Sequence, residues 1–171
     1  MKKMKWLGFT FVAILMLAAC GSNEEEATPA EETEEVDTAE VKSSIMREYL
    51  NMTTIVNGVD KDLTDYMVSE ATLEGEELQT AKDSASVAAA NAAAELEKIE
   101  LSDELGSYKE QVEGAFTTLK ESYEMKAEEL RKDESNMDAA NEKFAEAEKT
   151  LGDLLEEVGL VRTSLDKDLN S

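Results

Sequence analysis

From residue 37 to residue 165, apolar side chains recur every three or four positions along the chain. This spacing places them on one face of a helix, because successive helical residues are about 100° apart around the axis. Nowhere do β-branched and aromatic residues alternate over a long run, as they do in a half-buried strand. The pattern therefore predicts an all-α fold in which each helix buries one face against its neighbours.

Four apolar stripes follow one another, and each predicts one helix. The first two stripes are Ile45, Tyr49, Met52, Val56, Val59, Leu63 and Tyr66, and then Leu78, Ala81, Ala85, Ala88, Ala92, Leu96 and Ile99. The last two are Leu105, Tyr108, Val112, Ala115, Leu119, Tyr123 and Leu130, with Lys126 outside the pattern, and then Met137, Phe144, Ala147, Leu151, Leu154, Val158, Val161 and Leu165. Because the second stripe is mostly alanine, we expect close helix contact and a core of modest apolar area.

The first stripe predicts one long helix. Asp37 or Thr38 suits its N-cap, and Gly75 marks the turn that follows it. Asn57 and Gly58 lie within the stripe, but the apolar spacing keeps its phase across them. We therefore expect a helix that is bent at these two residues and continues beyond them.

Later boundaries are marked by other polar residues. Ser102 precedes two acidic residues and predicts an N-cap, and Ser135 with Asp138 resembles a capping box. Short polar loops between four helices predict an elongated, up-and-down antiparallel bundle. A bundle of three helices, with the second and third segments continuous, is the alternative.

Residues 1–19 have the composition of an export signal. Lysines at positions 2, 3 and 5 precede an almost wholly apolar run over residues 6–17. That run is short for a membrane-spanning helix, which needs about 20 apolar residues, but it suits the apolar part of a signal peptide.

Leu17, Ala18 and Ala19 directly precede Cys20, the single cysteine of the chain. These four residues resemble the lipobox of bacterial lipoproteins, in the style of Gram-positive bacteria. The resemblance implies that a dedicated peptidase cuts before Cys20 and that a diacylglycerol is attached to its sulfur. Two acyl chains suffice for stable membrane attachment. The resemblance therefore predicts a protein anchored by lipid at the extracytoplasmic face of the cell membrane.

The region after Cys20 differs in composition from the rest of the chain. Residues 20–36 are rich in glutamate, contain Pro29 and carry no basic residue, so we expect a disordered acidic linker. The predicted organisation is a removed signal peptide over residues 1–19, the lipidated cysteine and linker over residues 20–36, and a helical bundle domain over residues 37–171.

Acidic residues dominate the chain outside the signal peptide. Lysines and arginines number 17 against 40 aspartates and glutamates, and three of the lysines lie within the first five residues. Without those three, the side chains carry a net charge of about −26, which repels the phosphates of nucleic acids. We therefore expect no nucleic-acid partner.

The sequence predicts no catalytic, cofactor or metal site. Histidine, the commonest general base and a usual zinc ligand, is absent from the chain. Asp60, Asp62 and Asp65 lie close together, but an EF-hand loop counted from Asp60 needs a glycine at its sixth position and a glutamate at its twelfth. Asp65 and Ala71 stand there instead. We therefore expect a protein without enzyme activity.

Two kinds of function are compatible with these features. The first is a non-catalytic interaction module for an envelope protein, whose lipid anchor raises its concentration near membrane partners. The alternative is binding of a cell-wall polymer. Wall polymers are largely anionic, like this domain, so that alternative requires bridging divalent cations or sugar stacking. The apolar stripes could also close between chains, so the sequence leaves the oligomeric state open.

Overall fold

The computed structural model describes residues 32–169, with side chains from residue 38 onward. The predicted lipobox residues Leu17, Ala18, Ala19 and Cys20 lie outside the described residues. Over the described range the chain forms six α-helices and two short 3₁₀ helices, and this range contains no strand. The predicted all-α fold is therefore confirmed.

The first predicted helix is divided into two. α1 (Glu32–Asn57) begins before Asp37, and α2 (Lys61–Ser69) follows after a break and leads into the 3₁₀ helix η1 (Glu70–Thr72). The backbone carbonyl of Asp60 accepts hydrogen bonds from the N–H groups of Leu63 and Thr64, which starts a new helix. The predicted continuity through Asn57 and Gly58 is wrong. Glycine is costly inside a helix, so the backbone hydrogen bonds of α1 end there, and those of α2 begin anew at Asp60.

The middle of the chain follows the sequence pattern closely. α3 (Gly75–Leu96) starts at a glycine with φ of +59°, and the 3₁₀ helix η2 (Asp103–Tyr108) leads into α4 (Lys109–Glu129). The Ser102 hydroxyl accepts a hydrogen bond from the Glu104 N–H at 3.2 Å, which confirms the predicted N-cap. α3 and α4 are thus separate helices.

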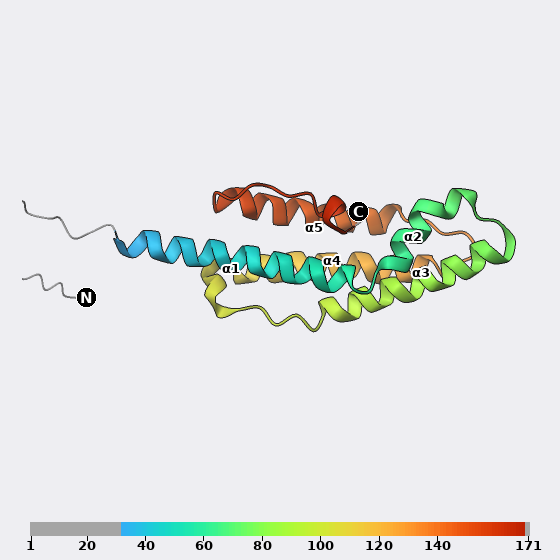
Figure 1. The fold of residues 1–171 in the computed structure, drawn as a ribbon, viewed down its shortest axis with the longest axis horizontal. Coiled ribbons are helices and arrows are strands. Elements are labelled where there is room, and N and C mark those ends of the chain that lie inside the picture. Colours follow the sequence, from blue (N-terminus) through green and yellow to red (C-terminus); the bar gives the residue numbers. More distant parts are fainter. Residues whose placement is uncertain (1–31, 170–171) are drawn as a thin grey trace, which may run out of the picture. The chain divides into compact units, whose positions relative to one another are not determined.

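The last stripe was predicted to form one helix through Leu165, and this prediction is wrong. α5 (Asp138–Glu157) ends before Gly159, which has φ of +74° and lets the chain reverse. The C-terminal segment (residues 160–169) then runs back along α5 and ends in α6 (Leu165–Leu169) (Figure 1). Val161 is therefore 83% exposed, whereas Leu165 is buried.

The predicted capping box at the start of α5 is not formed. The side-chain oxygen of Asn136 accepts a hydrogen bond from the Asp138 N–H at 2.8 Å, so Asn136 takes the role assigned to Ser135. A carbonyl oxygen on the asparagine side chain serves this purpose as well as a hydroxyl.

The long helices alternate in direction, as Figure 1 shows. α1 and α2 run one way, α3 returns, α4 runs forward again and α5 returns. α3 packs against α2 and α4, α4 packs against α5, and α1 packs against α3, η2 and α6. The predicted up-and-down helical bundle is confirmed. Its core contains most members of the four stripes, with five buried alanines from α3.

Candidate functional site

Lys126 is the most unusual residue of the core. It lies on α4 three residues after Tyr123 and four before Leu130, so the helical period places it on the buried face. Its side chain is only 3% exposed. Its Nζ lies 5.2 Å from the centre of the Tyr123 ring and 4.6 Å from the centre of the Phe144 ring. The ammonium group thus contacts the faces of two aromatic side chains, which attract cations.

A buried carboxylate lies beside this group. Asp60, at the break between α1 and α2, is 2% exposed and accepts a hydrogen bond from the Tyr123 hydroxyl at 3.1 Å. Burial raises the pKa of Asp60, while the hydrogen bond from Tyr123 and the charge of Lys126 oppose that rise. Burial and the nearby Asp60 also raise the pKa of Tyr123. The break that sequence reasoning missed therefore places Asp60 in the core.

Burial lowers the pKa of Lys126 to about 8, although the charges of Asp60 and Asp166 act in the opposite direction. The Lys126 Nζ lies against the two aromatic rings and forms no hydrogen bond with the residues described. Every fully enclosed side-chain nitrogen or oxygen in the described part of the chain does have a hydrogen-bond partner. The Lys126 ammonium is therefore not fully enclosed.

The Lys126 ammonium opens into a surface pocket of about 430 Å³, here called the Lys126 pocket. Its lining comes from four separate parts of the chain: α2, α4, α5 and the C-terminal segment. The lining residues are Met67, Lys126, Asn141, Phe144, Glu148, Ser164 and Asp166. The pocket thus combines one buried cation, an apolar wall and two carboxylates.

Glu148 is held in place by neutral donors. Its Oε1 accepts hydrogen bonds from the Ser164 hydroxyl at 3.1 Å and from the Asp166 N–H at 3.4 Å. These bonds join α5 to the C-terminal segment at the edge of the Lys126 pocket. The Glu148 carboxylate is therefore fixed at the edge of the pocket by the C-terminal segment.

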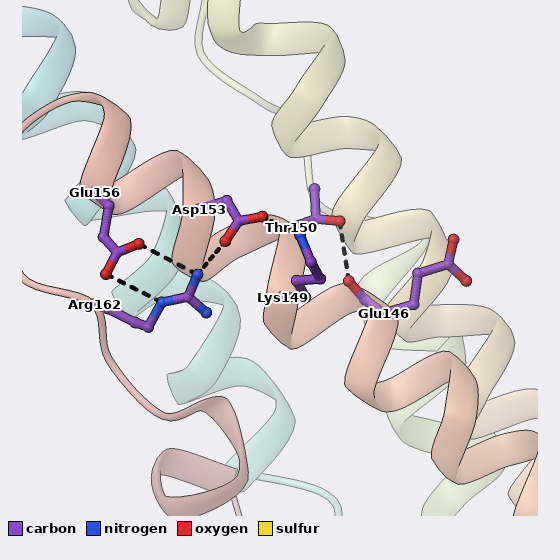
Figure 2. A network of polar contacts seen from close by, with 6 residues as sticks. All are labelled: Glu146, Lys149, Thr150, Asp153, Glu156 and Arg162. Carbon is purple, nitrogen blue, oxygen red and sulfur yellow. Dashed lines mark hydrogen bonds and ion pairs between the residues drawn. The ribbon is translucent and has the colours of Figure 1, made fainter.

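A network of ion pairs fastens the start of the C-terminal segment to α5 (Figure 2). The Arg162 guanidinium contacts the carboxylates of Asp153 and Glu156, and Lys149 also pairs with Asp153. The guanidinium lies directly over Gly152, where a Cβ atom would overlap it. At the other end of the segment, the Tyr49 hydroxyl donates a hydrogen bond to Asp168 at 2.6 Å. The C-terminal segment is therefore attached on both sides of the pocket.

A second depression, here called the α1 groove, lies between α1 and the C-terminal segment. It measures about 420 Å³ and is lined mainly by apolar surface. The lining residues are Lys42, Ser43, Met46, Arg47, Leu50 and Leu160. Leu50 is 55% exposed, so a large apolar side chain faces solvent in the groove. Two basic residues border it in a domain that is otherwise strongly acidic.

The residues weighed as metal ligands do not come together. Asp60 is buried, whereas Asp62 and Asp65 are exposed and Asp65 pairs with Lys61. Within residues 32–169, no three acidic, histidine or cysteine side chains lie close enough to hold a metal ion. The tyrosines lie as their helical spacing predicts: Tyr49, Tyr66 and Tyr123 are buried and Tyr108 is half-buried.

Among the described residues, no helix is both long enough and apolar enough to cross a lipid bilayer. Comparison with known proteins finds no matching family model, no matching curated protein and no matching solved structure.

Proposed function

We propose that the chain is an exported lipoprotein, cut before Cys20 and held at the extracytoplasmic face of the cell membrane by lipid on that cysteine. Its helical domain acts there as a non-catalytic interaction module for an envelope protein. The anchoring rests on the leader and on the lipobox residues Leu17, Ala18, Ala19 and Cys20. The interaction rests on the α1 groove.

The α1 groove supports this function through its combination of exposed apolar surface and basic residues. Met46, Leu50 and Leu160 offer an apolar floor, and exposed apolar surface of this kind is typical of interaction sites. Lys42 and Arg47 border that floor, and the Arg47 guanidinium is paired with Glu104. The occupant that fits is an amphipathic helix of a partner protein, with apolar residues toward Leu50 and acidic residues toward Lys42.

The position of the groove in the chain also favours this function. Lys42 is 22 residues from the predicted lipid-bearing Cys20. A tether that short limits the distance between the groove and the membrane surface. This limit increases the effective concentration of the groove for a membrane protein. A partner that is itself in the membrane therefore needs only a modest intrinsic affinity.

In-cell photo-crosslinking tests the interaction. A photo-reactive residue at position 50 should yield one recurring protein adduct, whereas the same residue at Val87 should not. Val87 is a suitable control because it is 58% exposed and lies on α3, away from the groove lining. Lys42→Glu should abolish the adduct at position 50. Equal adducts at both positions, or wall-polymer fragments as the only adducts, would contradict the proposal.

The anchor is tested separately by metabolic labelling with a clickable fatty acid. The wild-type chain should incorporate the label and remain with the membrane fraction. Cys20→Ser should lose the label and remain unprocessed, because the peptidase of this pathway acts on the lipidated cysteine. Labelling that persists in the Cys20→Ser variant would place the lipid elsewhere and contradict the anchoring.

A further inference from the structure

The Lys126 pocket contains a buried ammonium group that forms no hydrogen bond with the described residues. A buried ammonium is costly unless it is paired or hydrogen-bonded. Lys126 is 3% exposed, and its ammonium lies against the Tyr123 and Phe144 rings. Its three N–H donors are therefore available to an acceptor that enters the pocket.

The opposite charge lies beside the same pocket. The carboxylates of Glu148 and Asp166 belong to its lining, and Glu148 is bonded by neutral donors alone. A free anion that approached Lys126 would be repelled by these carboxylates and by the net charge of the domain. A simple cation would be attracted to the edge of the pocket but repelled from Lys126.

A ligand that carries both charges satisfies both requirements. We propose that the Lys126 pocket binds a free α-amino acid, with its carboxylate on the Lys126 ammonium and its α-ammonium on the carboxylate of Glu148. Phe144 and Met67 supply an apolar wall, so an apolar side chain fits the remaining space. The Asn141 amide also lines the pocket and can donate to the ligand carboxylate.

This site lies apart from the α1 groove, because the two depressions share no lining residue. The inference therefore goes beyond the proposed interaction with an envelope protein, and each can fail without the other. The two depressions are nevertheless both lined by the C-terminal segment, through Leu160 in the groove and through Ser164 and Asp166 in the pocket.

Isothermal titration of the purified bundle domain, as the full chain without its signal peptide, tests the proposal. Each proteinogenic amino acid is titrated in turn at millimolar concentration, with L-leucine as the first probe. We expect saturable binding of at least one apolar amino acid. L-Leucinamide lacks the carboxylate and 4-methylpentanoate lacks the ammonium, and each should bind about tenfold more weakly than L-leucine or worse.

Variants locate the site. Lys126→Met and Glu148→Gln should each weaken binding by about tenfold or more. Lys143→Met and Asp133→Asn remove matched charges outside the pocket lining and should leave binding unchanged. Circular dichroism and urea unfolding of each variant show whether the domain is folded, and if Lys126→Met does not fold, Glu148→Gln decides.

Three results would overturn the proposal. The first is the absence of saturable binding for every amino acid tested. The second is equal binding of L-leucine and L-leucinamide, which would show that the carboxylate is not recognised. The third is unchanged affinity in the folded Lys126→Met or Glu148→Gln domain, which would place the ligand elsewhere on the protein.

Discussion

Lys82 and Lys126 are both buried lysines, but their surroundings differ. Lys82, on α3, is 7% exposed and donates hydrogen bonds to the backbone carbonyls of Lys132 and, at 3.2 Å, Asp133. Lys126, on α4, is 3% exposed and contacts aromatic faces without any hydrogen bond to the described residues. Burial of a charge alone therefore does not indicate a functional site. The informative difference is whether the chain itself supplies the acceptors.

The comparison assigns Lys82 a structural role. It binds carbonyls just beyond the C-terminal end of α4, which is also the negative end of the helix dipole. It thereby joins α3 to the loop between α4 and α5. Between residues 38 and 169, no equivalent set of acceptors is supplied to Lys126.

The largest effect is expected for Lys82→Met. Loss of the charged donor leaves the carbonyls of Lys132 and Asp133 without their partner, and we expect the free energy of unfolding to fall by about 2 kcal/mol. Urea unfolding at neutral pH measures this. Lys98→Met removes an exposed lysine and should change stability by less than about 0.5 kcal/mol. Similar stabilities for the two variants would contradict a structural role for Lys82.

Lys126 should affect the pH dependence of stability. Its folded pKa of about 8 lies below the usual value of 10.5, so the unfolded chain binds more protons between these values. Stability should therefore rise with pH, by about 2 kcal/mol from pH 7 to pH 9.5, relative to Lys126→Met. Urea unfolding of both proteins over this range measures the difference. A constant difference would show that the ammonium is not destabilised by burial.

Tyr123→Phe tests the hydrogen bond to Asp60 beside Lys126. We expect a loss of about 1.5 kcal/mol at pH 7, because a buried carboxylate loses a donor. The pKa of Asp60 is already raised by burial, and loss of the Tyr123 donor should raise it further. A group whose pKa is raised in the folded protein favours folding at acid pH. The stability difference between wild type and Tyr123→Phe should therefore become smaller as the pH falls through the pKa of Asp60. An equal loss at pH 4 and pH 7 would contradict this account.

The smallest effect is expected for Ser86→Ala, one helical turn from Lys82. The Ser86 hydroxyl donates to the Ala127 carbonyl at 2.8 Å, so it joins α3 to α4 with a neutral donor instead of a charged one. We expect a loss of about 1 kcal/mol in thermal or urea unfolding, against almost none for the exposed Ser84→Ala. A loss as large as that of Lys82→Met would show that charge adds nothing to this interface.

The helical period predicted most of the fold. The apolar stripes identified the long helices and their buried faces, and Ser102 was correctly predicted as an N-cap. The errors arose where backbone conformation overrides periodicity. At Gly58 and Gly159 the chain leaves the helix although the apolar spacing continues, so one helix became two and another ended early.

The Lys126 pocket could be predicted only in part. Lys126 stands at the position that the helical period assigns to the core, but a charged residue there was treated as outside the pattern. The signal existed in the spacing from Tyr123 to Leu130. The remaining lining residues come from α2, α5 and the C-terminal segment, and periodicity within one helix does not say which helices will meet.

The return of the C-terminal segment to α1 also bears on the order of folding. The Tyr49 hydroxyl and Asp168 are 119 residues apart in the chain, and the buried Leu165 and Leu169 belong to the same segment. A chain made from its N-terminus must be synthesised through Asp168 before α1 can acquire this contact. Until then the face of α1 around Tyr49 stays uncovered. Residues 160–169 therefore distinguish a complete bundle from one that lacks this segment.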